Sequence, residues 1–191
     1  MFQELRASLS IVILFTLITG LAYPWAMTGL GQSLFRHQAN GSLVTQGDTI
    51  IGSELIGQNF TTDRYFHGRP SAAGDGYDAA NSSGSNEAPT APDFIKAVAA
   101  RAAALRANGS KNPIPADLLT ASGSGLDPDI SVAAAQYEAP RVAAARGLPA
   151  PQVMQIIAQN TRPRTLGFIG EPRVNVLALN RAIDMLETKA P

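Results

Sequence analysis

The longest uninterrupted apolar pattern lies at the N-terminal end of the chain. After Glu4 and Arg6 no charged residue occurs before Arg36, so the 29 positions from 7 to 35 carry no charge. A helix that crosses a membrane needs about 20 mainly apolar residues. The pattern therefore predicts four segments: a short N-terminal tail at 1–8, a transmembrane helix at 9–30, a juxtamembrane connector at 31–42 and a soluble domain at 43–191.

Two other interpretations of the apolar segment compete with a membrane anchor. A buried core helix rarely has so long a run without charge. A cleaved signal peptide has a core of about 7–15 apolar residues, and the small residues Gly20 and Ala22 are suitably spaced for a cleavage site. The apolar character continues beyond Ala22 as far as Leu34, which favours an uncleaved anchor.

Within this segment, aromatic, proline and small residues have separate expected roles. Tyr23 and Trp25 are typical of an interfacial aromatic belt. Pro24 lacks an N–H, so we expect it to kink the helix or to mark the interface. Small side chains allow close approach of a second helix. The candidates for such packing are Gly20, Ala22, Ala26 and Gly29.

The rest of the chain alternates between short apolar patterns and turn residues. Gly47-Asp48 predicts a hairpin between two short apolar strands, whereas 57–90 shows no helical or strand period and predicts a long ordered loop. Helices are expected at 92–106, stopped by Asn108-Gly109, from 127 with an interruption at Pro140, at 151–159, and at 176–187 with Asn175 as its cap. The predicted fold is a single N-terminal transmembrane α-helix followed by a mixed α/β soluble domain with short strands and several helices.

Charge and composition remove several classes of function. The chain has 15 basic and 15 acidic residues, which argues against binding nucleic acid through bulk positive charge. Because it contains no cysteine, it has no disulfide, thiolate metal site or cysteine nucleophile.

The search for catalytic chemistry yields few candidates. His67 lies beside Arg69, and neither a second metal ligand nor an orienting carboxylate can be placed near it, so we interpret it as a structural or interface residue. Two Ser/Gly loops can form anion-binding turns, although ordinary turns are the simpler interpretation. Their candidate residues are Ser83, Gly84 and Ser85 in the first loop and Ser122, Gly123 and Ser124 in the second, which we expect to lead into a helix.

Several motifs, taken in order, resemble the C subunit of the bacterial Kdp-type potassium-transporting ATPase (the KdpC family). The resemblance runs from about residue 5 to about residue 187. It is carried by L-I-T-G-L-A-Y-P (17–24), G-S-E-L-I-G-Q-N-F (52–60), Y-F-H-G-R-P-S-A (65–72), S-S-G-S-N (82–86), L-L-T-A-S-G-S-G-L-D-P (118–128), P-R-V-A-A-A-R-G-L (140–148) and G-E-P-R-V-N-V-L-A-L-N (170–180).

This resemblance implies a non-catalytic accessory subunit of an ATP-driven potassium uptake pump in the bacterial inner membrane. Its partners would be a channel-like potassium-binding A subunit, a P-type ATPase B subunit and a small F subunit, together with the lipid bilayer. The soluble domain would lie on the outer, periplasmic side. The surface expected to contact partners comprises Phe60, Tyr65, Phe66, His67 and Arg69.

The family is also described as raising the ATP affinity of the ATPase subunit. That effect would involve nucleotide contact near a Q-x-x-R-V-A element, which here corresponds to residues 138–143. Glu138 stands where the family usually has glutamine, and its charge would repel nucleotide phosphates, whereas Arg141 matches. We therefore expect no tightly bound cofactor, with ATP as a ligand implied only by the resemblance. The alternative is an exported ligand-binding or enzymatic domain that uses His67, Arg69 and the Ser/Gly loops.

Overall fold

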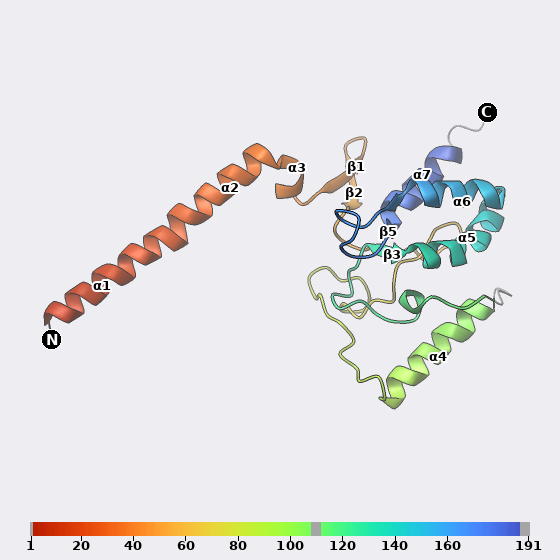
Figure 1. Cartoon of the computed structure of the whole chain (residues 1–191), viewed down its shortest axis with the longest axis horizontal. Coiled ribbons are helices and arrows are strands. Elements are labelled where there is room, and N and C mark those ends of the chain that lie inside the picture. Colours follow the sequence, from red (N-terminus) through yellow and green to blue (C-terminus); the bar gives the residue numbers. More distant parts are fainter. Residues whose placement is uncertain (1, 108–111, 188–191) are drawn as a thin grey trace. The chain divides into compact units, whose positions relative to one another are not determined.

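The computed structural model describes residues 2–107 and 112–187, and the expected Asn108-Gly109 helix stop lies outside them. Two compact units make up the chain, Met1–Ile51 and Gly52–Pro191. The fold class expected from the sequence, a long apolar N-terminal helix followed by a mixed α/β region, is confirmed (Figure 1).

The first unit is dominated by one continuous helical stretch. It consists of α1 (Phe2–Leu17), a π-helical turn η1 (Ile18–Ala22) and α2 (Tyr23–Leu34), followed by the short α3 (Arg36–Ala39). Within residues 2–34 the most apolar 18-residue window has a mean hydropathy of 2.0 and none of it is buried, so this stretch is long and apolar enough to span a membrane.

The helix absorbs Pro24 by changing its hydrogen-bond pattern locally. The ring of a proline clashes with the carbonyl four residues earlier and its nitrogen has no proton to donate. The N–H of Tyr23 therefore bonds to the carbonyl oxygen of Ile18, five residues back, and the helix continues through the π turn.

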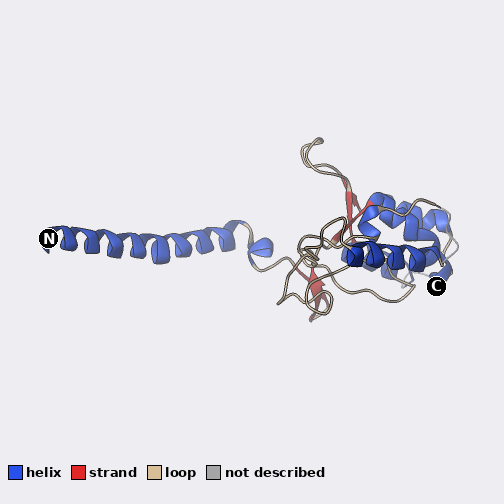
Figure 2. Cartoon of the chain, turned by 90° about the horizontal axis from the view of Figure 1, so that it is seen from below, coloured by secondary structure: helices blue, strands red, loops and turns tan. Residues whose placement is uncertain are grey.

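The expected hairpin is present as β1 (Leu43–Gln46) and β2 (Thr49–Ser53), joined by Gly47-Asp48. After β2, the chain forms a long segment without regular helices or strands as far as Ala91, drawn as loop in Figure 2. The expectation of a long loop at 57–90 is thus confirmed. α4 (Pro92–Arg106) follows with the predicted bounds, Pro92 lying in its first turn.

The second unit has its core between a small sheet and three helices. The antiparallel sheet has the order β3 (Asp129–Ser131), β5 (Arg173–Asn175) and β4 (Thr161–Arg162). α5 (Val132–Arg146) packs on α6 (Ala150–Gln159), which in turn packs on α7 (Val176–Glu187). Their apolar faces form one core with the sheet, and its fully or nearly fully buried members include Phe66, Ile130, Ala134, Val142, Val153, Ile157, Val174, Leu179 and Ile183.

The start predicted for α5 at residue 127 is wrong. Residues 129–131 form β3 instead, and the helix begins at Val132, where the hydroxyl of Ser131 accepts a hydrogen bond from the N–H of Ala134. Pro140 does not interrupt the helix either. It lies on the exposed face of α5, where the carbonyl that loses its donor can be hydrated, while the opposite face stays buried.

Candidate functional site

The candidate residues of the long loop are fastened to α5 and α7 by polar side chains. Asn180 on α7 is buried and binds both backbone groups of Phe66. Its side-chain oxygen accepts from the Phe66 N–H at 2.8 Å, and its side-chain nitrogen donates to the Phe66 carbonyl at 3.0 Å. Phe66, one of the expected partner-contact residues, is fully buried in the core of this domain, so its side chain is not part of the outer surface.

Glu138 on α5 is a carboxylate enclosed by the chain's own donors. It is only 3% exposed; its Oε2 accepts from the backbone N–H of His67 at 2.9 Å, and its Oε1 accepts from Arg141 at 2.9 Å. Burial raises the pKa of Glu138, and the positive charges of Arg141 and His67 oppose that rise. The orienting carboxylate that could not be placed from the sequence therefore lies beside His67, with 3.7 Å between Glu138 Oε1 and His67 Nδ1.

The other ring nitrogen of His67 contacts the carbonyl of Thr62 at 3.2 Å. Both ring nitrogens are thus within reach of acceptors from this domain. This arrangement fits a histidine that orders the loop, because a general base needs a ring nitrogen directed at a reacting group.

Two arginines on α5 hold the segment just before Phe66. Arg141 donates to the carbonyls of Asp63 at 2.8 Å and Tyr65 at 3.0 Å, besides its ion pair with Glu138. The Arg146 guanidinium lies 4.8 Å from the centre of the Tyr65 ring, and it pairs with Asp184 at 2.8 Å. Both arginines thus pair with carboxylates, and both also donate to backbone carbonyls of the loop.

Arg69 is also used within the domain. It forms an ion pair with Asp127 at 3.1 Å, and its own carbonyl accepts from the Tyr77 hydroxyl at 2.6 Å. Burial is the main cause that raises the pKa of Tyr77 to about 12, with Asp127 contributing. Asp127 thus binds Arg69 and caps its own turn toward Asp129, which explains why it does not start a helix. Neither Tyr77 nor Asp184 was found from the sequence, because their partners are distant in the chain.

The two Ser/Gly loops lie against one another. The N–H of Ser83 donates to the carbonyl of Ser124 at 3.0 Å, although the two residues are 41 positions apart. A side chain at Gly84 would come within 2.9 Å of the Gly123 carbonyl oxygen, so the two backbones are in close contact. Ser122 is buried, Ser85 is exposed, and the second loop leads into β3. The expectation that this loop leads directly into a helix is therefore wrong.

Two clefts include Glu138 in their lining. The first has a volume of about 510 Å³ and its lining includes Phe60, His67, Arg69 and Tyr77; the second, of about 420 Å³, includes Asp63 and Arg141. Tyr65 and Phe60 pack with their ring centres 5.4 Å apart. Within residues 2–107 and 112–187, no cluster of three or more His, Asp or Glu side chains is arranged to hold a metal ion.

The small residues expected to pack in the membrane helix lie on η1 and α2. An added side chain at Gly20 or Gly29 would meet no atom within 4 Å, so both positions are open to a neighbouring helix.

Comparison with known proteins adds what the geometry alone does not supply. The family model for the K⁺-transporting ATPase c chain, KdpC, matches residues 5–185. The chain belongs to the KdpC family. It is 59% identical to the potassium-transporting ATPase KdpC subunit of Serratia proteamaculans, over 96% of this chain and 98% of the relative. It is 55% identical to that of Beijerinckia indica, over 96% and 94%, and 54% identical to that of Gemmatimonas aurantiaca, over 100% and 97%.

The resemblance inferred from the motifs is thereby confirmed. The chain is a subunit of a potassium-transporting ATPase, and its apolar helix of 33 residues indicates association with a membrane.

Proposed function

We propose that this chain is a non-catalytic, membrane-anchored accessory subunit that assembles and stabilises an ATP-driven, high-affinity potassium uptake pump. The observation that carries this proposal is the use of the candidate polar residues within the domain. Glu138 and Arg141 bind the 63–67 loop and each other, and Arg69 binds Asp127. A side chain committed to internal hydrogen bonds is poorly placed to bind or transform a substrate, so the domain acts through its surface.

The partners in this proposal are a channel-like potassium-binding A subunit, a P-type ATPase B subunit and a small F subunit. The helix at 2–34 anchors the chain in the inner membrane, with the open positions Gly20 and Gly29 available to a neighbouring helix. The soluble domain lies on the periplasmic side. Protease treatment of intact spheroplasts tests the sidedness: the domain should be cleaved from outside, and complete protection would contradict the proposal.

Assembly is tested by co-purification from membranes that hold all subunits. A chain truncated after residue 51 keeps the first unit and removes the second. We expect the truncated chain to be recovered poorly with the other subunits, and potassium-dependent ATPase activity to fall. Full assembly and full activity with the truncated chain would overturn the proposal.

We further propose that any rise in the ATP affinity of the ATPase subunit is indirect, and that this chain holds no tightly bound cofactor. Glu138 brings negative charge to the element at 138–143, which disfavours phosphate. The Arg141 guanidinium is already bound to Glu138 and to loop carbonyls, so this element offers phosphate no free cation. The pump prepared with the chain truncated after residue 51 should have a higher KM for ATP than the pump that contains the full chain. Titrating ATP against the full chain alone in detergent should leave its melting temperature unchanged. A concentration-dependent rise would instead establish direct binding.

A second candidate function is supported by the 510 Å³ cleft lined by His67 and Arg69. In that case the domain binds a small ligand or acts as an enzyme after export. The substitutions His67→Ala and Arg69→Ala, both at residues that line this cleft, distinguish the two. An accessory role predicts that they affect stability alone, whereas a ligand site predicts lost binding in a correctly folded variant.

A further inference from the structure

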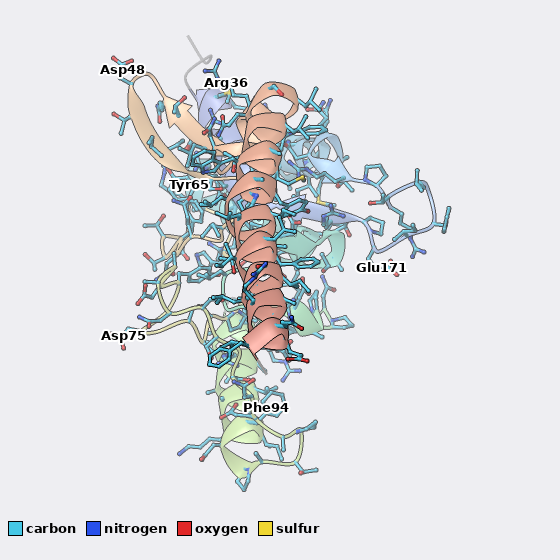
Figure 3. The ribbon with its side chains drawn as sticks, turned by 90° about the vertical axis from the view of Figure 1, so that its left-hand side faces the viewer. Arg36, Asp48, Tyr65, Asp75, Phe94 and Glu171 are labelled. Atoms are coloured by element: carbon cyan, nitrogen blue, oxygen red, sulfur yellow. The ribbon has the colours of Figure 1, made fainter. Side chains whose placement is uncertain are left out.

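A hairpin between β4 and β5 presents apolar side chains to the outside of the domain. Thr165 and Ile169 exchange two backbone hydrogen bonds of 2.9 Å, and Arg164 pairs with Glu171 at 2.6 Å across the base. We call residues 164–171 the apolar hairpin. Figure 3 shows Glu171 on this segment, which projects from the helices of the second unit.

The tip of the apolar hairpin is strongly exposed. Leu166 is 79% exposed, Phe168 71% and Ile169 51%. Large apolar side chains that gather on one projecting element mark an interaction site more often than isolated exposed ones do. A hairpin that is already closed by backbone hydrogen bonds loses less conformational entropy on binding than an unstructured loop does.

The backbone of the tip adds a second observation. Leu166 has a φ of 54° and is followed by Gly167 with a φ of 85°. A left-handed φ is disfavoured for a residue with a side chain, and glycine is the usual choice there. The Leu166 side chain is largely exposed, so packing within the domain does not explain why leucine occupies the position. Such strain is characteristic of functional positions.

The charges around the apolar hairpin indicate which partner it fits. A loop that binds the surface of an anionic bilayer carries basic residues free to contact lipid headgroups. The arginines beside this hairpin are instead paired with carboxylates. The pairs are Arg164 with Glu171 at 2.6 Å, Arg173 with Asp129 at 2.9 Å, and Arg162 with Glu54 at 3.7 Å. An apolar tip with a charge-balanced base fits an apolar groove on a protein.

We propose that the apolar hairpin docks into an apolar groove on another subunit of the same ATPase, with Phe168 and Leu166 as its central contacts. This inference rests on the accessory role proposed above and specifies the surface that performs it. Buried aromatic anchors commonly contribute a large part of the binding energy of an interface.

The first test substitutes exposed apolar residues in the full chain, co-expressed with the other subunits. Phe168→Ser should weaken retention of the chain in the detergent-purified complex by about ten-fold or more on dilution. Ile95→Ser on α4 is the matched control, because Ile95 is 56% exposed on a different element, and it should not change retention. Equal retention of Phe168→Ser and the original chain would overturn the proposal.

Leu166→Gly separates docking from folding. Glycine relieves the left-handed backbone, so the melting temperature of the full chain should stay the same or rise, while retention in the complex falls. Unchanged retention in this variant would overturn the role of Leu166 in docking, and a fall that only accompanies a lower melting temperature would show that the hairpin is structural.

A lipid-facing role is tested with a single tryptophan at the tip. Trp25→Phe combined with Phe168→Trp places the only tryptophan on the hairpin. In liposomes of brominated phosphatidylcholine and phosphatidylglycerol that hold this chain alone, we expect unquenched emission typical of exposed tryptophan. The emission should shift to the blue when the complex assembles. Quenching by the brominated lipid would overturn the proposal in favour of bilayer insertion.

The hairpin and the accessory role can fail separately. If truncation after residue 51 prevents assembly but Phe168→Ser does not, the accessory role stands and the hairpin assignment is wrong. If truncation itself has no effect, the accessory role is wrong.

Discussion

Replacing Arg141 with alanine should destabilise the domain substantially, because it leaves the buried carboxylate of Glu138 without its cation. In the folded chain the Arg141 side chain is 12% exposed and that of Glu138 is 2% exposed. Removing one partner of a buried ion pair costs about 3–5 kcal/mol. Arg141 is not fully buried, and the backbone N–H of His67 still donates to Glu138 in the variant. We therefore expect a loss of unfolding free energy near the lower end of that range.

A double-mutant cycle separates the part of this stability loss that comes from the ion pair from the part that comes from the other hydrogen bonds of Arg141. In Glu138→Gln the amide oxygen can still accept from His67, and no buried charge remains to be compensated. In that background Arg141→Ala should cost only about 1–2 kcal/mol, for the lost hydrogen bonds to the carbonyls of Asp63 and Tyr65. The difference between the two backgrounds measures the ion pair itself.

The pH dependence gives an independent check with a defined sign. Burial already raises the pKa of Glu138 above the ordinary value of 4.5, and without Arg141 less positive charge opposes that rise. Because the pKa of Glu138 in the folded state exceeds that in the unfolded state, the contribution of this group to stability is greatest below about pH 4.5 and falls as pH rises through the folded pKa. The deficit of Arg141→Ala should therefore shrink in acid, while the double variant shows no such change.

The assay is urea unfolding of the full chain in detergent, followed by near-UV circular dichroism of the tyrosines. Three of the four tyrosines, Tyr65, Tyr77 and Tyr137, belong to the second unit, whereas Tyr23 and Trp25 of the first unit are exposed, so the tyrosine signal lost on unfolding reports mainly on the second unit. Equal destabilisation by Arg141→Ala with Glu138 or glutamine present, at every pH, would refute the assigned charge pairing.

Three other substitutions test contacts of the long loop at 57–90. Gly125→Ala should lose about 2–4 kcal/mol of unfolding free energy in urea, because φ at Gly125 is +66° and the added carbon would lie within 3 Å of backbone atoms. Gly123→Ala is the control: an added carbon there meets open space, so this variant should unfold like the original chain. Asn180→Ala should lose about 2–4 kcal/mol, since it leaves two backbone groups of Phe66 unsatisfied, and faster amide exchange at Phe66 would verify the cause. Tyr77 keeps its proton to about pH 12 in the folded state, so the original chain should lose stability between pH 10 and 12 more steeply than Tyr77→Phe, as measured by alkaline unfolding. An identical alkaline profile for the two proteins would contradict the assigned burial.

Elements with a local signal could be predicted from the sequence closely. α4 and α7 have the predicted bounds, because Pro92 fits a first helical turn and Asn175 caps the following helix through the N–H of Ala178. The hairpin at Gly47-Asp48 follows the same logic. In each case the deciding residues lie within a few positions of the element they define.

The start of α5 could not be predicted in the same way. Asp127-Pro128 has the composition of a helix start, yet the carboxylate of Asp127 pairs with Arg69, 58 positions earlier. The contact of Ser83 with Ser124 is similarly long-range. Local propensity was overridden there by contacts between distant segments, which a single sequence does not show.

The contacts of a side chain indicate whether it stabilises the domain or serves its surface. Glu138, Arg141 and Asn180 are bound to the loop, so their substitution should lower stability, and assembly should fall only as far as folding does. Phe168 and Leu166 contact solvent, so their substitution should lower assembly while stability is retained. Measuring the melting temperature and retention in the complex for the same variants therefore assigns each residue to folding or to docking. A variant of the first kind that kept its full melting temperature but left the complex would show that the loop itself is part of the interface.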